Sequence, residues 1–150
     1  MTFRCLRAAW PAAALAGAIA AGPPGVCPVA SVRVTNAATG FDLGYAASAS
    51  SLGGYITSDN APETTVPRGT TDAFTITSTS AHALAGALIY RAAGDPAREC
   101  TFRYTLTYAG GRFVLTTDAR ASWTGPVSCT VASTGPDKTK GDFGVTFTMK

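Results

Sequence analysis

The chain has 150 residues, 46% hydrophobic and only 14% charged, a length that suits one domain. The formal net charge of +3 falls to about +1 without the two N-terminal arginines, Arg4 and Arg7. A charge this small, with no basic stripe, excludes the nucleic-acid-binding class. Thr, Ser, Gly and Ala dominate the remainder, a composition that favours strands and turns over helices.

The first 21 residues have the pattern of a secretory signal peptide. Arg4 and Arg7 form a basic start, residues 8–21 are apolar and rich in alanine, and Ala18-Ile19-Ala20 supplies a small–x–small cleavage pattern. The apolar run is shorter than the ~20 residues of a membrane span. We therefore expect a signal peptide over 1–21, with cleavage as late as residue 30 as the alternative.

The expected mature domain, 22–150, is secreted, periplasmic or at the cell surface. Cleavage near Ala20 leaves three cysteines, Cys27, Cys100 and Cys129, so one would be unpaired. We favour a Cys100–Cys129 disulfide, with buried free thiols as the alternative. Val26 before Cys27 does not suit a lipidation site.

Along the chain, short runs of alternating or apolar residues are separated by Gly, Pro, Asn and Ser. They predict strands at 31–36, 41–47, 71–77, 84–91, 100–109, 112–118, 127–132 and 142–149. Residues 55–57 are a short strand or a loop edge, 48–54 a loop, 58–69 irregular and 92–98 a turn. This pattern predicts an all-β chain, an antiparallel β-sandwich of about eight strands, with a barrel as the alternative.

The clearest element is a hairpin at 100–118 around Gly110-Gly111, since a two-glycine loop suits a primed turn. With Ala109 opposite Arg112, Tyr108 faces Phe113 and Leu106 faces Leu115. Arg103 then lies opposite Asp118 on the other face, which gives one apolar and one charge-matched face.

The search for catalytic residues finds little. The single histidine, His82, lies in a small-residue loop without the partners of a triad, and the carboxylates are scattered near turns, where they commonly cap backbone N–H groups. The chain has no CxxC, and neither Gly53-Gly54 nor Gly110-Gly111 leads into a phosphate loop. We expect no enzymatic activity, no metal site and no cofactor.

Aromatic residues are the better candidates for ligand binding. The phenylalanines on strand faces are expected in the core: Phe41, Phe74, Phe113, Phe143 and Phe147. Four others could insert at a lipid headgroup layer or stack on a sugar ring: Trp123, Tyr55, Tyr104 and Tyr108. For Trp123, beside the Gly125-Pro126 turn, the alternative is a plug at one end of the sandwich.

Short motifs follow one another over most of 31–149. They are SVRVTNAATGFDL, Ser51-Leu52-Gly53-Gly54-Tyr55, Val66-Pro67-Arg68-Gly69, Phe74, Gly86, Ile89-Tyr90, Thr101-Phe102, VSC and VTFTM. Their order resembles the aegerolysin-like β-sandwich proteins, a group that includes small bacterial crystal proteins. The resemblance implies the fold and membrane-lipid association, and for some members toxin-like action with a partner protein in pore formation. In that group the Thr-Phe strand continues into Trp, Asn and Pro, whereas here it continues as 103–108, so lipid specificity is not carried over.

Two functions from different classes follow. The first is a secreted, non-enzymatic β-sandwich that binds a membrane lipid or a glycan through one loop end, with Trp123 and Tyr55 as the first candidates. The alternative is an exported envelope-surface or structural domain that pairs through a sheet edge and takes no small-molecule ligand.

Overall fold

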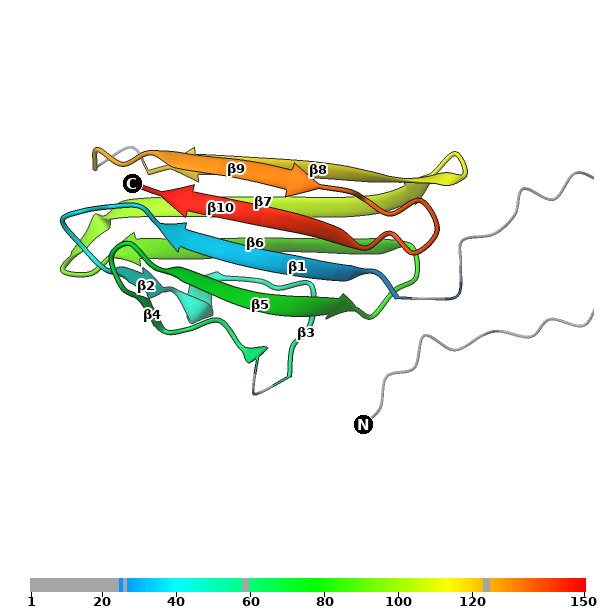
Figure 1. Ribbon diagram of the computed structural model, residues 1–150, viewed down its shortest axis with the longest axis horizontal. Coiled ribbons are helices and arrows are strands. Elements are labelled where there is room, and N and C mark those ends of the chain that lie inside the picture. Colours follow the sequence, from blue (N-terminus) through cyan, green and yellow to red (C-terminus); the bar gives the residue numbers. More distant parts are fainter. Residues whose placement is uncertain (1–24, 26, 58–59, 123–124) are drawn as a thin grey trace, which may run out of the picture.

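The computed structural model describes residues 25, 27–57, 60–122 and 125–150. Its strands form two five-stranded sheets, one packed against the other (Figure 1). Sheet A has the order β3-β5-β1-β10-β9 and sheet B the order β4-β2-β6-β7-β8. The bounds are β1 Val29–Asn36, β2 Leu43–Tyr45, β3 Gly54–Tyr55, β4 Thr65–Val66, β5 Thr71–Ser78, β6 Ala83–Ala92, β7 Asp95–Ala109, β8 Arg112–Ala121, β9 Cys129–Thr134 and β10 Phe143–Met149. The all-β sandwich expected from the sequence is confirmed, with β1 and β10 pairing in parallel and the other pairs antiparallel.

The core lies between the sheets and follows the period-two pattern of the strands. In β10 every second residue is buried, from Phe143 to Met149. The Phe102 and Phe147 rings, from opposite sheets, stack with centroids 4.7 Å apart. Phe74 and Phe113 are also buried, so four of the five predicted core phenylalanines are confirmed. The fifth, Phe41, is half-buried and lies under the Arg98 guanidinium, 5.7 Å from the ring centroid.

The hairpin of β7 and β8 has the predicted register at every pair, including Tyr108 opposite Phe113. Gly110 and Gly111 have φ of 59° and 79°, as a primed turn requires. Arg103 does lie opposite Asp118, but the ion pair of this carboxylate is with Arg120 at 2.7 Å, because both lie on the same face of β8. The charge-matched pair predicted across the hairpin is therefore replaced by a pair within one strand.

The predicted Cys100–Cys129 disulfide is confirmed, with a Cα–Cα distance of 5.8 Å. Cys100 belongs to β7 in sheet B and Cys129 to β9 in sheet A, so the bond joins the two layers. Cys27 is disulfide-bonded as well. The bonds indicate an oxidising environment for the folded chain.

Four expected segments differ in the structure. The strand predicted at 41–47 is only Leu43–Tyr45. It begins late because the Phe41 carbonyl accepts a hydrogen bond from the Asn36 side-chain amide at 3.0 Å. The expected loop at 48–54 includes a 3-10 turn, Ala47–Ala49, and the irregular segment 58–69 contains β4. The turn predicted at 92–98 is shorter, since β7 already begins at Asp95. The expected signal peptide, 1–21, lies outside the described residues.

Candidate functional site

Tyr104 is not a surface residue, which corrects its place among the ligand-binding candidates. It is fully buried, and its hydroxyl donates to the Leu52 carbonyl at 2.6 Å. Burial raises the pKa of the Tyr104 phenol above its usual range. A ring enclosed in this way cannot stack on a sugar or enter a lipid headgroup layer.

The other tyrosine candidates remain partly accessible. Tyr55, in β3 at the edge of sheet A, is 49% exposed. Tyr108 is half-buried, because its ring meets Phe113 edge-on with centroids 4.9 Å apart. Trp123 lies outside the described residues.

Three turns meet at one end of the sandwich, which we call the hairpin end: residues 79–82, 110–112 and 135–142. The Tyr108 N–H donates to the His82 carbonyl at 2.8 Å, which ties the first turn to the hairpin. Gly141 lies so close to Phe113 that an added Cβ would be 2.8 Å from its ring, so the third turn packs on β8. His82 is exposed in its loop, without an arrangement that activates it.

Asp137 organises the turn at 135–142. Its Oδ1 accepts the Thr139 hydroxyl at 2.7 Å and the N–H groups of Thr139 and Lys140, both at 2.8 Å. These hydrogen bonds, the Thr139 hydroxyl first, lower the pKa of Asp137 to about 2. The carboxylate is therefore ionised at neutral pH and fixes the loop in one shape.

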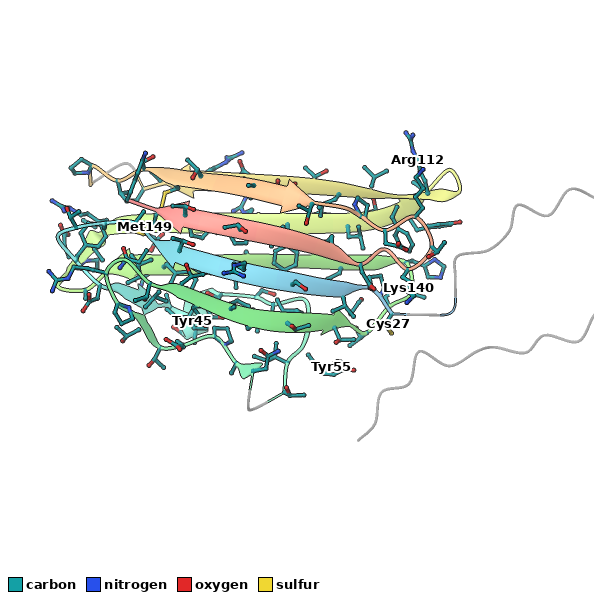
Figure 2. All side chains as sticks on the ribbon, viewed as in Figure 1. Cys27, Tyr45, Tyr55, Arg112, Lys140 and Met149 are labelled. Atoms are coloured by element: carbon teal, nitrogen blue, oxygen red, sulfur yellow. A yellow bond between two sulfur atoms is a disulfide. The ribbon has the colours of Figure 1, made fainter. Side chains whose placement is uncertain are left out.

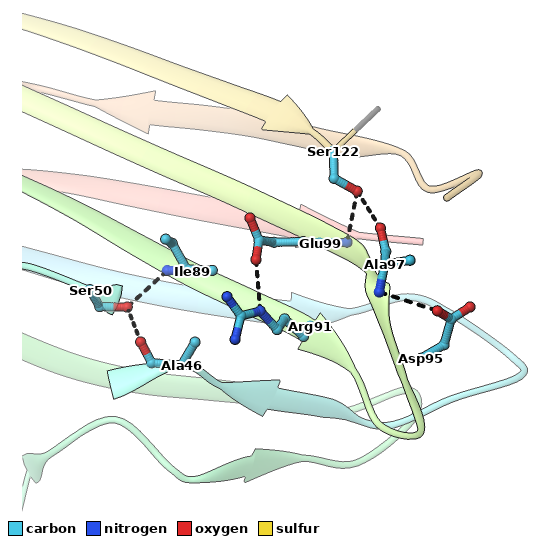
Figure 3. A network of polar contacts seen from close by, with 8 residues as sticks. All are labelled: Ala46, Ser50, Ile89, Arg91, Asp95, Ala97, Glu99 and Ser122. Atoms are coloured by element: carbon cyan, nitrogen blue, oxygen red, sulfur yellow. Dashed lines mark hydrogen bonds and ion pairs between the residues drawn. The ribbon is translucent and has the colours of Figure 1, made fainter. Parts of the chain in front are cut away.

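Four arginines are ion-paired toward one end of the molecule, whereas three cations at the other end form no ion pair with a described residue. Four ion pairs lie in or beside the end opposite the hairpin end: Arg68–Asp42 at 3.4 Å, Arg91–Glu99 at 2.7 Å, Arg98–Asp95 at 3.2 Å and Arg120–Asp118 at 2.7 Å. Figure 3 shows the Arg91–Glu99 pair among neighbouring hydrogen bonds. At the hairpin end, Arg112, Lys138 and Lys140 form no ion pair with any described residue. Sequence reasoning missed this difference, since pairing depends on which turns meet in space.

Two exposed large hydrophobic residues lie in the half of the molecule toward the hairpin end, on opposite edges of the sandwich. Tyr55 and Val114 are the large hydrophobic residues exposed within the described ranges, at 49% and 40%. Val114 is two residues from Arg112 on β8, and Tyr55 pairs with Thr77 near the end of β5. In Figure 2, Tyr55, Arg112 and Lys140 lie in one half of the molecule and Tyr45 and Met149 in the other.

A groove runs over the outer face of sheet A and under the turn at 135–142. It consists of two cavities of about 510 and 260 Å³ that share Ser31, Thr134 and Gly144. We call it the sheet groove. Asp137 and Asp142 line the larger cavity and Arg33 the smaller.

Within the part of the chain that the structure describes, no group of three or more His, Cys, Asp or Glu side chains could hold a metal ion. Among the same residues, no helix is long and apolar enough to cross a bilayer.

No protein-family model matches the chain, and no curated protein matches it. A solved structure, the crystal structure of the lipid binding protein Nakanori, is similar with a TM-score of 0.57 and 15% sequence identity. The match covers 83% of this chain and 72% of that one. At this identity the likeness shows the fold alone, so the aegerolysin-like resemblance of the sequence is supported as a coarse likeness of fold.

Proposed function

We propose that the protein is an exported, non-enzymatic β-sandwich that binds membrane lipid through its hairpin end. One observation carries the proposal: cations without an ion pair and exposed large hydrophobic residues lie in the same half of the molecule. Arg112, Lys138 and Lys140 form no ion pair with a described residue, although the Asp137 carboxylate interacts electrostatically with Lys140. Val114 is exposed two residues from Arg112, and Tyr55 is exposed on the other edge of the sandwich in the same half of the molecule. The shared fold of a lipid binding protein supports the same function.

This combination suits a bilayer surface. A lysine or arginine near an anionic membrane contributes about 1 kcal/mol, so three cations give useful but reversible attraction. Tyrosine places an apolar ring and a polar hydroxyl at the level of the headgroups. The paired arginines at the opposite end are already neutralised by carboxylates and offer less to a phosphate.

The test is sedimentation with vesicles of phosphatidylcholine, with and without phosphatidylserine. We expect binding that increases with phosphatidylserine and falls in the Lys138→Gln/Lys140→Gln variant. The matched control is Arg103→Gln/Lys150→Gln, which removes two exposed, unpaired charges away from the hairpin end and should bind normally. Background binding to every vesicle, or equal loss in both variants, would contradict the proposal.

Trp123 gives an independent check on which end meets the lipid. It follows Ser122, whose hydroxyl contacts the Ala97 carbonyl and accepts the Glu99 N–H at 3.3 Å, beside the opposite end (Figure 3). In a Trp10→Phe chain, Trp123 is the single tryptophan. Unchanged emission on adding vesicles would agree with lipid contact at the hairpin end, whereas a blue shift would show that Trp123 enters the lipid.

A further inference from the structure

The sheet groove exists because β10 carries a glycine between two hydroxyl-bearing strands. Gly144 lies opposite Ser31 of β1 and Thr134 of β9. A Cβ on Gly144 would be 2.6 Å from the Thr134 hydroxyl oxygen, so any larger residue would fill the floor of the groove. One row further along the strands, Arg33, Thr146 and Ala132 continue the channel.

The polar groups of the groove are mainly acceptors and hydroxyls. The Asp142 Oδ1 accepts the Val29 N–H at 2.9 Å, and the hydrogen bonds to Asp137 also end on Oδ1. Asp137 and Asp142 both line the larger cavity, and none of these hydrogen bonds uses the Oδ2 atom of either carboxylate. Ser31, Thr134 and Thr146 add hydroxyls that both donate and accept.

The charge of the larger cavity selects against an anionic ligand. Two carboxylates and no lysine or arginine line it, so a phosphate would be repelled there. A sugar instead offers hydroxyl donors to carboxylate oxygens, and such charge-assisted hydrogen bonds are stronger than neutral ones. Val29 and Pro136 supply apolar surface for the C–H face of a sugar ring.

We propose that the sheet groove binds the uncharged saccharide headgroup of a glycolipid, while the cations of the hairpin end contact the surrounding phospholipids. This inference rests on the proposed lipid-binding function and names its ligand class. The position of the groove agrees with this proposal. The turn at 135–142 lines the groove and also carries Lys138 and Lys140.

The experiment compares vesicles of phosphatidylcholine and phosphatidylserine with vesicles that also contain digalactosyldiacylglycerol. We expect at least about tenfold tighter binding to the glycolipid vesicles, the gain of one good charge-assisted hydrogen bond. Gly144→Ala, which fills the floor, and Asp142→Asn, which keeps an oxygen for the Val29 N–H, should abolish this gain. Thr148→Val is the control, since Thr148 lies on β10 beside the groove but outside it.

Each outcome decides between the two proposals. Equal binding to both kinds of vesicle overturns the saccharide site and leaves lipid binding intact. Binding to neither overturns both. If free digalactosylglycerol shifts the amide resonances of Ser31, Thr134 and Gly144 but no vesicle binds, the groove takes a free saccharide and the glycolipid proposal fails. Thermal unfolding of each variant shows that a loss does not come from misfolding, and Asp142→Asn serves if Gly144→Ala does not fold.

Discussion

At the scale of single residues, Gly86 is the partner that allows Tyr104 to be buried. The two are paired across β6 and β7, and a Cβ on Gly86 would overlap the Tyr104 hydroxyl and lie 2.9 Å from the Ser51 carbonyl oxygen. We expect Gly86→Ala to lower the free energy of unfolding by about 1–3 kcal/mol in urea denaturation, the usual cost of overpacking. Gly40→Ala, with open space around it, is the control. An equal effect in both variants would contradict the role of Gly86.

Asp137 gives a second test at this scale. Its pKa is lowered from 3.8 to about 2, so its stabilisation of the turn at 135–142 is complete above pH 3.8 and is lost as the pH falls toward 2. Thr139→Val removes the hydroxyl that donates at 2.7 Å and should raise the Asp137 pKa toward 3.8. Titration of the carboxyl carbon by NMR measures this value. An unchanged pKa in the variant would show that the hydroxyl does not set it.

The same scale shows where sequence reasoning stops. Tyr104 and Tyr108 are both on the inward face of β7, because they are four positions apart and side chains alternate between the faces of a strand. Their burial differs, since Tyr104 lies opposite a glycine in mid-sheet whereas Tyr108 is next to the turn. The glycine opposite Tyr104 is known only once β6 and β7 are paired, so the alternation alone could not separate a core tyrosine from a surface one.

At the scale of elements, the signals that are local in sequence are the ones that predict the structure. The β7–β8 hairpin follows from alternation and a Gly-Gly turn, which lie within twenty residues. Strand β2 and its neighbour β4 depend instead on Asn36, whose amide donates to the carbonyls of Phe41 and Val66, both at 3.0 Å. This contact links residues 30 positions apart and therefore leaves no local pattern.

The disulfide is an element-scale feature with a measurable energy. It links residues separated by 29 positions, which corresponds to about 3–4 kcal/mol of lost chain entropy in the unfolded state. We expect Cys100→Ala/Cys129→Ala to lower the free energy of unfolding by about this amount in urea denaturation. Reduction of the unchanged protein should give at least this loss, because it also breaks the disulfide bond of Cys27. A loss below about 1 kcal/mol would mean that the packing of β9 on β7 and β8 of sheet B holds the layers together without the bond.

At the scale of the whole molecule, the two ends of the sandwich differ in a way that the sequence does not display. Cations are spread along the chain, and only the fold collects Arg112, Lys138 and Lys140 at one end while pairing the arginines at the other. The sheet groove is equally hidden, because Ser31 and Thr134 are 103 positions apart in the sequence and are brought together only by β10. Composition and alternation predicted the sandwich, but the candidate sites belong to its tertiary arrangement.

The core as a whole also sets how the protein responds to alkaline pH. Tyr90 and Tyr104 are fully buried, and burial raises the pKa of both phenols far above their ordinary value of 10.0. Above pH 10 the unfolded chain therefore loses protons that the folded chain keeps, and stability falls as pH rises, by up to about 1.4 kcal/mol per pH unit for each tyrosine. Urea denaturation between pH 8 and 12, with phenolate absorbance followed in parallel, measures this slope.

Tyr90 allows the slope to be assigned. Its hydroxyl has no hydrogen-bond partner within the described chain, so Tyr90→Phe removes a desolvated polar atom without breaking a bond. At pH 7 we expect Tyr90→Phe to be at least as stable as the original chain, and above pH 10 its stability should fall about half as steeply, since Tyr104 alone then contributes. A variant destabilised at pH 7 would show that the Tyr90 hydroxyl has a partner such as a buried water. An unchanged alkaline slope would show that Tyr90 already ionises in the folded state, and the two sheets would then be less tightly closed around it than the packing indicates.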